Sequence, residues 1–304
     1  MRTVPDGITR PPYLATGGRP AGRAGLQILT GDELERMRVA CRVAAEVLLE
    51  TGAAVSSGMT TDELDRIAHE AYLSRGAYPS TLGYNGFSKS VCTSVNEVVC
   101  HGIPDSRVLR DGDIVNIDVT AYIEGMHGDT SATFAVGPLD DPTEVLVDVT
   151  CRATLAGIAA IAPGCPLGVV GEAIESLAHE YGLGVVRDYG GHGIGSVFHG
   201  EPHVNHTKER GSSLELVPGL TFTVEPMITA GTFKHTQWDD DWTEVTDDLL
   251  PTAQFEHTVI VTTDGVEILT VTADGDTAVR WPNRLAEAVA AESLSSDLPG
   301  SAAR

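Results

Sequence analysis

Apolar residues in the first part of the chain recur at helical spacing. After Thr30 they fall every three or four positions, at Leu34, Met37, Cys41, Ala44 and Leu48. A second such stretch follows Thr60 and stops before Gly76; it contains Leu64, Ile67, Ala71 and Tyr72. Each stretch opens on a threonine with a glutamate three residues later, which is the pattern of a capping box. The sequence therefore predicts two helices, one after Thr30 and one between Thr60 and Gly76.

The period changes to two near residue 113. One face of the next run carries Asn116, Asp118 and Thr120, and the other face carries valine and isoleucine. A turn at residues 124–125 separates this run from a second one, which contains Asp129. Such alternation is typical of β-strands, and a tight turn joins them as an antiparallel hairpin. We expect the hairpin to bring the carboxylates of Asp118 and Asp129 together.

The second half of the chain repeats this order. Helix-periodic stretches at 142–161 and 167–182 precede strand-like runs beginning at 184, 220 and 254. The dipeptide Asp264-Gly265 favours a further hairpin turn. Helices followed by strands, twice over, predict an α/β (α+β) domain of two similar halves, although the halves share no repeat of residue identity.

Three segments are expected along the chain. Residues 1–30 are rich in proline, glycine and arginine and predict an extended arm. Residues 31–272 hold the periodic stretches and predict one folded domain. Residues 273–304 are rich in alanine, serine and aspartate; they predict a partly disordered tail with a short helix at 283–294.

Charge limits the partners of this chain. Its 304 residues carry a net charge of -23, which disfavours binding of nucleic acid through the general field. The arm alone is basic, with Arg2, Arg10, Arg19 and Arg23 against Asp6. It is either a solvated tail or a weak contact for an anionic partner such as ribosomal RNA.

The compartment follows from cysteine usage and hydropathy. The five cysteines form no CxxC pair and are odd in number, which indicates a reducing compartment and free thiols. No apolar run reaches the roughly 18 residues of a membrane span, and the N-terminus lacks the apolar core of a secretory signal. We expect a cytoplasmic protein that is a monomer.

Five residues stand out as candidate metal-binding side chains in segments that are otherwise apolar. Four are carboxylates in strand-like runs and one is a histidine between glycines: Asp118, Asp129, His192, Glu225 and Glu256. Taken singly, each acid fits an edge strand and the histidine fits a structural role. Taken together they suggest one metal site, because a buried carboxylate is costly unless paired or bound to a cation. The set lacks thiolate, which favours catalytic Mn, Fe, Co or Zn over structural zinc.

The charge of this set suits two divalent ions. Four ionised carboxylates carry four negative charges, and two such ions balance them. Without metal, like charges this close would force one or more of the carboxyl groups to hold a proton. Two ions held close together lower the pKa of a shared water and create a nucleophile at neutral pH.

The segments around these residues resemble a known family. They are VCHGIPD (99–105), DIVNIDVTAYIEGMHGDTSATF (113–134), GGHGIG (190–195), FTVEPM (222–227) and AQFEHTV (253–259). In this order they resemble type I methionine aminopeptidases, in particular actinobacterial members with an N-terminal extension, over about residues 31–270. The resemblance implies the pita-bread fold, a pseudo-twofold antiparallel sheet flanked by helices with a dinuclear metal site between the halves. It also implies hydrolytic removal of the initiator methionine from nascent proteins and peptides, with a small second residue preferred.

The resemblance also assigns roles. Asp118, Asp129 and Glu256 would contact or bridge two divalent ions (Co, Mn, Fe, Zn or Ni), and His192 and Glu225 would complete one ion's shell. Glu225 would in addition be the general base. His101 would lie near the substrate amine, and His199 would hydrogen-bond the scissile amide. The methionine pocket would be formed by Tyr84, Phe87, Cys92, Phe198 and Trp242. The remaining histidines with no family match are expected to be structural or on the surface: His203, His206, His235 and His257.

Two alternatives remain open from the residues. An Xaa-Pro peptidase has the same fold and a similar ligand set, but usually a large N-terminal domain, whereas 117 residues precede Asp118 here. A pita-bread binding protein without catalysis usually lacks some ligands, whereas all five are present here. The chain also departs from the family pattern, with Thr81 in place of a common cysteine and Ser88 in place of a common proline.

Overall fold

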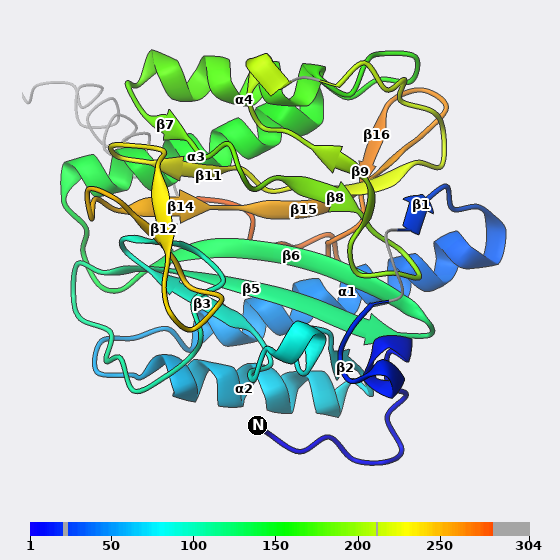
Figure 1. Ribbon diagram of the computed structural model, residues 1–304, viewed down its shortest axis with the longest axis horizontal. Helices are drawn as coiled ribbons and strands as arrows, with labels where there is room; N and C mark the ends of the chain where they lie inside the picture. Colours follow the sequence, from blue (N-terminus) through cyan, green and yellow to red (C-terminus); the bar gives the residue numbers. More distant parts are fainter. Residues whose placement is uncertain (21–23, 211, 282–304) are drawn as a thin grey trace, which may run out of the picture.

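Two pairs of helices enclose a large curved sheet. The computed structural model describes residues 1–20, 24–210 and 212–281. In Figure 1, α1 (Gly31–Ala53) and α2 (Thr61–Ser74) lie below the long strands, and α3 (Asp141–Ala159) and α4 (Val169–Glu180) lie above them. The four predicted helices are thus confirmed, and each half of the molecule contributes one pair.

Local caps explain where the helices begin. Thr60 forms a complete capping box, since its side chain accepts from the Glu63 amide and the Glu63 carboxylate accepts from the Thr60 amide. Thr30 occupies the N-cap position of α1, but its side chain makes no capping hydrogen bond. Asp140 caps α3 through the Thr143 amide at 3.0 Å. The threonine pattern therefore located both starts but predicted the hydrogen bonds at only one.

The large sheet contains strands from both halves. Its order is β1 (Ala24–Leu26), β9 (Gly200–Val204), β8 (Gly191–Gly193), β10 (Thr221–Val224), β15 (Glu256–Val261), β6 (Met126–Ala135), β5 (Ile114–Ile123) and β2 (Tyr78–Pro79), with β16 (Val266–Ile268) on β15 and β3 (Cys92–Val95) on β5. The pairs are antiparallel except β1 with β9, which is parallel. The expected antiparallel sheet is therefore mixed at its β1 edge.

The predicted hairpin is β5 and β6. Its turn residues Glu124 and Gly125 both have left-handed backbone angles, with φ of 52° and 82°, as a two-residue hairpin turn requires. Asp118 lies opposite Ser131, and Thr120 lies opposite Asp129. Residues opposite or two apart share a face, so both aspartates point to the same side of the sheet, as expected.

Two small sheets complete the architecture. One is β14 (Thr252–Gln254), β11 (Met227–Thr229) and β7 (Gly184–Val185); the other is β12 (His235–Gln237), β13 (Glu244–Thr246) and β4 (Val98–Cys100). The strands predicted at 220–229 and 254–262 are each broken, one at 225–226 and one at Phe255. Pro226 has no amide hydrogen to pair, so β10 ends before it and β11 joins a different sheet. The first break contains the predicted ligand Glu225, and the second directly precedes the predicted ligand Glu256.

Three 3-10 turns and the core complete the description. The turns are η1 (Pro12–Thr16), η2 (Tyr84–Gly86) and η3 (Lys208–Arg210). The core between helices and sheet contains fully buried large side chains, among them Leu48, Leu64, Tyr72, Phe222 and Phe255. No helix among the described residues is long and apolar enough to cross a membrane.

The N-terminal arm packs on the domain through much of its length. Val4 and Tyr13 are only 5% and 7% exposed, and the chain begins beside α2 (Figure 1). Arg2 donates to the buried carboxylate of Asp65 at 2.6 Å. A wholly solvated tail is therefore wrong for residues 2–16, because ionic contacts with α2 and apolar contacts with residues 78–84 hold them. Arg23 and the helix predicted at 283–294 lie outside the described residues, and the boundaries at 30 and 272 stay predictions.

Candidate active site

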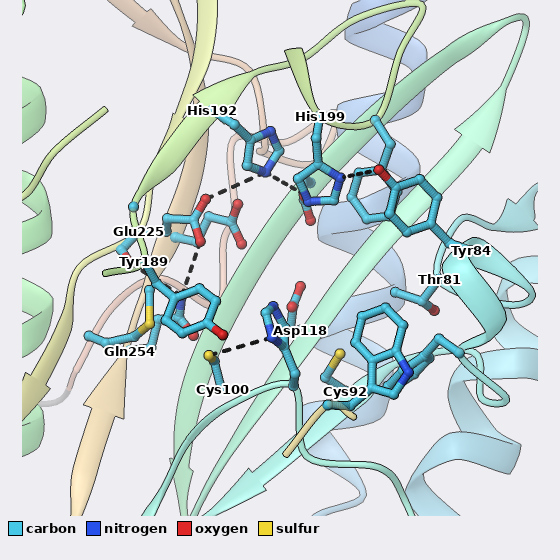
Figure 2. A pocket seen from close by; sticks show the side chains of 18 of the residues that line it. Thr81, Tyr84, Cys92, Cys100, Asp118, Tyr189, His192, His199, Glu225 and Gln254 are labelled. Atoms are coloured by element: carbon cyan, nitrogen blue, oxygen red, sulfur yellow. Dashed lines mark hydrogen bonds and ion pairs between the residues drawn. The ribbon is translucent and has the colours of Figure 1, made fainter. Parts of the chain in front are cut away.

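One cavity of about 350 Å³ lies between the two halves (Figure 2). All twelve residues predicted from the sequence line it: Tyr84, Phe87, Cys92, His101, Asp118, Asp129, His192, Phe198, His199, Glu225, Trp242 and Glu256. They come from β3, β5, β6, β8 and β15, and from the loops between strands. The sheet therefore collects residues that are up to about 170 positions apart in the sequence.

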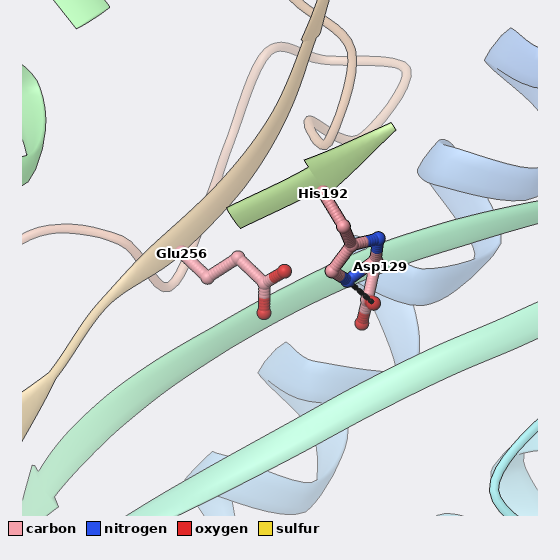
Figure 3. Close-up of side chains that lie close together, drawn as sticks. All are labelled: Asp129, His192 and Glu256. Atoms are coloured by element: carbon pink, nitrogen blue, oxygen red, sulfur yellow. Dashed lines mark ion pairs between the residues drawn. The ribbon is translucent and has the colours of Figure 1, made fainter. Parts of the chain in front are cut away.

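Three ligand candidates in the cavity lining lie close together (Figure 3). Asp129, His192 and Glu256 each present a ligand atom, and these atoms lie within 4.8 Å of one another. Glu225 adjoins them, since its Oε1 is 3.5 Å from His192 Nε2, which is also 3.6 Å from Asp129 Oδ2. Asp118 lines the same cavity from β5 without belonging to the compact three-residue cluster.

Neighbouring polar side chains hold the acidic groups in place. Thr120 Oγ1 donates to Asp129 Oδ1 at 2.8 Å, and Thr223 Oγ1 donates to Glu225 Oε1 at 2.6 Å. Gln254 Nε2 donates to the other Glu225 oxygen at 3.3 Å. Sequence reasoning missed these three partners as site residues. The sequence could have indicated the two threonines, because each lies two positions from a predicted ligand and therefore on the same side of an extended chain.

Burial raises the pKa of every acidic group in the cluster. It raises the pKa of Asp118 to about 7 and that of Glu225 to about 8. The pKa of Asp129 and that of Glu256 are also raised well above their usual range by burial, and next by the charges of the other carboxylates. Four acids this close cannot all be ionised at neutral pH without a compensating cation.

These residues fit divalent metal ions. Glu256 Oε1 is buried and has no hydrogen-bond partner in the structure. Within the described part of the chain, the ion pairs of Asp129 and Glu225 are with His192 rather than with lysine or arginine. An unpartnered buried oxygen beside three other carboxylates and an imidazole is the donor set of a catalytic metal site.

Two histidines flank the cluster. His101 has a left-handed backbone with φ of 57°, a strained conformation of the kind that functional sites retain. His199 is exposed at the mouth of the cavity, and its Nδ1 lies 3.0 Å from the Tyr84 hydroxyl. Desolvation by the surrounding protein lowers the pKa of both imidazoles, and for His199 the nearby His192 and His101 lower it further. Both rings are therefore neutral at physiological pH.

An apolar pocket adjoins the acidic cluster. Phe87 packs edge-on against Trp242 with ring centres 5.0 Å apart, and Tyr84 lies 4.8 Å from Phe198. Cys92 and Thr81 also line this part, together with residues not predicted there: Asn85, Cys100, Tyr189 and Met227. The unpredicted residues lie in short strands and loops, where the sequence shows no period.

The other histidines have varied contacts. His206 is buried and accepts from the Glu225 amide at 3.3 Å through Nε2, so it supports the site from behind. His257 is bonded to Thr270 and His235 to Glu244, both at 2.7 Å. His203 lines a smaller neighbouring cavity of about 250 Å³. The structural role expected for His257 agrees with its full burial.

The sequence and the fold identify a class of protein. The model of metallopeptidase family M24 matches residues 35–263, and the chain belongs to this family. Within this family, several proteins that are similar to this chain are methionine aminopeptidases. Methionine aminopeptidase 2 of Mycobacterium tuberculosis is 55% identical over 271 residues, which cover 88% of this chain and 94% of that protein.

Solved structures agree. The crystal structure of methionine aminopeptidase from Rickettsia prowazekii superposes with a TM-score of 0.79 at 45% identity, over 81% of this chain and 100% of that one. The prolidase from Pyrococcus furiosus superposes with a TM-score of 0.65 at 20% identity, over 81% and 66% respectively, which shows a shared fold alone. The resemblance to methionine aminopeptidases and the pita-bread fold expected from it are thereby confirmed.

Proposed function

We propose that this protein removes the initiator methionine from nascent proteins and peptides by metal-dependent hydrolysis. The observation that carries this proposal is the cavity, in which buried carboxylates and imidazoles adjoin an apolar pocket of aromatic and sulfur-containing side chains. Such a pocket suits methionine because a polarizable thioether packs favourably against aromatic rings. Relatives with the same fold and high identity are named methionine aminopeptidases.

We assign the metal site to two divalent ions. Asp118, Asp129 and Glu256 would contact or bridge both ions, and His192 and Glu225 would complete the shell of one. When bound, the ions supply Lewis acidity toward the scissile carbonyl and a low pKa for the attacking water. The metal used in the cell is Co, Mn, Fe, Zn or Ni in this proposal.

Glu225 has the position of a proton carrier. It accepts the proton of the attacking water and delivers it to the amine that leaves. Thr223 and Gln254 donate to its two oxygens, at 2.6 Å and 3.3 Å, and so fix the direction of its carboxylate. A base held in one orientation needs no rearrangement before each proton transfer.

His199 donates a hydrogen bond to the scissile amide. Its ring is neutral, so only one of its nitrogens carries a proton. The Tyr84 hydroxyl lies 3.0 Å from His199 Nδ1, and we assign the hydroxyl as the donor in this hydrogen bond. The imidazole proton then lies on Nε2, which is left free to donate to the substrate.

His101 and the pocket residues orient the substrate. His101 contacts Tyr189 and Trp242 edge to face, with ring centres 5.3 Å and 6.0 Å away. It would lie near the free amine, while Tyr84, Phe87, Cys92, Phe198 and Trp242 surround the methionine side chain. In this arrangement the second residue of the substrate lies outside the apolar pocket, and a small side chain is preferred at that second position.

Peptide hydrolysis tests the proposal. The metal-loaded protein should release methionine from Met-Ala-Ser at least about tenfold faster than from Met-Arg-Ser, because a large second residue disturbs the alignment of the scissile bond. It should leave an Xaa-Pro dipeptide uncut. Faster cleavage of the Xaa-Pro peptide would assign the site to the prolidase reaction instead, and binding of metal without cleavage of either would assign a non-catalytic role.

The proposal also covers the oligomeric state, the compartment and the partners of the protein. We propose that the protein works as a monomer in the cytoplasm and that its basic arm makes at most a transient contact with the ribosome. Arg2 is committed to Asp62 and Asp65 within the protein, which leaves Arg10 and Arg19 as the exposed described arginines of the arm. Co-sedimentation with ribosomes should therefore weaken in a variant with both replaced by alanine, and unchanged sedimentation would refute the contact.

A further inference from the structure

The N-terminal arm reaches the wall of the active site. Tyr13, in η1, is 7% exposed, and its hydroxyl donates to the carbonyl of Ser80. Its ring packs edge-on against Tyr84, with centroids 5.1 Å apart and planes at 83°. Tyr84 in turn holds His199 through the 3.0 Å bond to Nδ1 (Figure 2). A residue outside the cavity lining thus lies two contacts from a residue of the proposed reaction.

The arm also holds the backbone that carries Tyr84. The amide of Asn85 donates to the carbonyl of Gly18 at 2.8 Å. A Cβ added to Gly18 would lie 2.0 Å from the Gly83 carbonyl oxygen, which shows how closely the two segments approach. Gly83 and Asn85 both have left-handed backbone angles, with φ of 87° and 47°. In Asn85, which carries a side chain, this conformation needs supporting contacts, and residues 12–18 supply several of them.

The docking of the arm is fixed at its far end as well. Arg2 donates to the buried Asp65, and the Thr3 carbonyl is 3.1 Å from His69 Nε2. Val4 packs with Tyr78, Leu82 and Tyr122. Residues 2–4 are thus attached to the domain by contacts of their own, separate from those of Tyr13 and Gly18.

We propose that Tyr13 and Gly18 of the arm form an outer layer of the active site, in which Tyr13 is a positioning residue that acts through Tyr84 on His199. The inference rests on the proposed function. The aromatic edge of Tyr13 fixes the Tyr84 ring, and the Tyr84 hydroxyl fixes the orientation and the tautomer of the imidazole. Tyr13 itself touches no substrate.

The first test is a double-mutant cycle on the full-length, metal-loaded protein. Tyr13→Leu should lower kcat for Met-Ala-Ser by about tenfold, with KM changed less than about threefold, because the group displaced acts in the transition state. Tyr84→Phe should give a similar loss. If Tyr13 acts through Tyr84, the double variant should lose no more than Tyr84→Phe alone. An unchanged kcat in Tyr13→Leu, or losses that multiply in the double variant, would overturn the proposal.

Two adjacent glycines provide a matched pair. Gly17 and Gly18 both have left-handed backbone angles, with φ of 72° and 88°, so alanine costs about 1 kcal/mol of backbone strain at either position. A Cβ on Gly17 meets nothing within 4 Å, whereas a Cβ on Gly18 collides with Gly83. Gly18→Ala should therefore reduce kcat as Tyr13→Leu does, while Gly17→Ala should retain the wild-type kcat. Equal kcat in the two glycine variants would contradict the proposed layer.

A readout without turnover separates this proposal from the proposed function. In protein labelled with ¹³C at histidine Cε1, the His199 resonance should shift in Tyr13→Leu and in Tyr84→Phe, and it should stay in place in Val4→Ala. Val4 is also a buried residue of the arm, so it controls for looser docking. An unmoved His199 resonance in Tyr13→Leu overturns the positioning role. Inactive wild-type protein with the expected shifts would instead reject the proposed reaction alone.

Discussion

At the scale of single residues, the structure brings the predicted side chains into one cavity, while their roles stay predictions. Each of the twelve predicted residues lines the cavity, because they stand out either as carboxylates in apolar strands or through the family motifs. Gln254 and His206 were not predicted as supports of Glu225, since their hydrogen bonds exist only after β14 and the 200–210 segment come to lie beside it. Thr223 was overlooked, although it lies only two positions from Glu225.

The first prediction concerns Glu225. Glu225→Gln should lower kcat for Met-Ala-Ser by about 10³-fold, because an amide cannot accept the proton that the carboxylate moves. The metal-free variant should unfold at a higher temperature than metal-free wild type, since one buried acid has been removed. Differential scanning calorimetry and peptide assays check the two effects. Retained turnover would remove Glu225 from the mechanism.

The second prediction concerns pH. In metal-free protein, burial raises the pKa of Asp118 to about 7 and that of Glu225 to about 8, above their values in the unfolded chain. These two groups then bind more protons in the folded state than in the unfolded state between about pH 4 and 8, so their contribution to stability falls as pH rises through this range. Buried histidines with a lowered pKa have the opposite effect below about pH 7. We therefore expect the Tm of metal-free protein to drop from pH 7 to pH 8.5, and metal-saturated protein to show a smaller drop. A metal-free Tm that rises over this range would contradict the assigned burial.

At the scale of helices and strands, the number of residues in an element determined whether the sequence could predict it. The four long helices and the β5–β6 hairpin have enough residues to show a period. Strands of two to four residues, such as β3, β4, β12 and β13, carry too few positions to do so. The breaks at Glu225 and Phe255 also escaped prediction, because they arise where one strand passes from the large sheet to a small one.

The third prediction uses the two helix caps. Thr60→Ala removes the hydrogen bond that the Thr60 side chain accepts from the Glu63 amide and should lower the free energy of unfolding by about 1 kcal/mol. Thr30→Ala is the matched control, since Thr30 occupies the same N-cap position without a side-chain hydrogen bond. Urea unfolding of both variants measures the difference. An equal loss in the two would show that the capping box contributes nothing to stability.

The fourth prediction concerns the contact of α1 with β6. A Cβ on Gly128 would lie 2.4 Å from backbone atoms of Ala40 and Cys41, which cannot yield as a flexible side chain would. Gly128→Ala should therefore lower the free energy of unfolding by about 1–3 kcal/mol, which is the typical cost of overpacking. Gly7→Ala meets no atom within 4 Å and should leave the free energy of unfolding nearly unchanged. Similar unfolding of both variants would place the helix farther from the strand.

At the scale of the whole molecule, the two-half architecture explains the site. Each half contributes a helix pair and ligand-bearing strands, and the carboxylates from both halves converge in one buried cavity. The sequence predicted this division from the repeated order of its periods. It did not predict the docking of the arm, because the contacts of Arg2, Val4 and Tyr13 involve partners that are more than 60 residues away in the sequence.

Metal dependence of the reaction is decided by the release of methionine from Met-Ala-Ser by protein stripped of metal and then titrated with Co, Mn, Fe, Zn or Ni. The stripped protein should show no turnover, and at least one of these ions should restore it. The same titration of His192→Ala should restore far less, because the variant lacks a ligand of the compact cluster. Full activity after stripping, or full restoration in His192→Ala, would contradict a metal-dependent peptidase at this site.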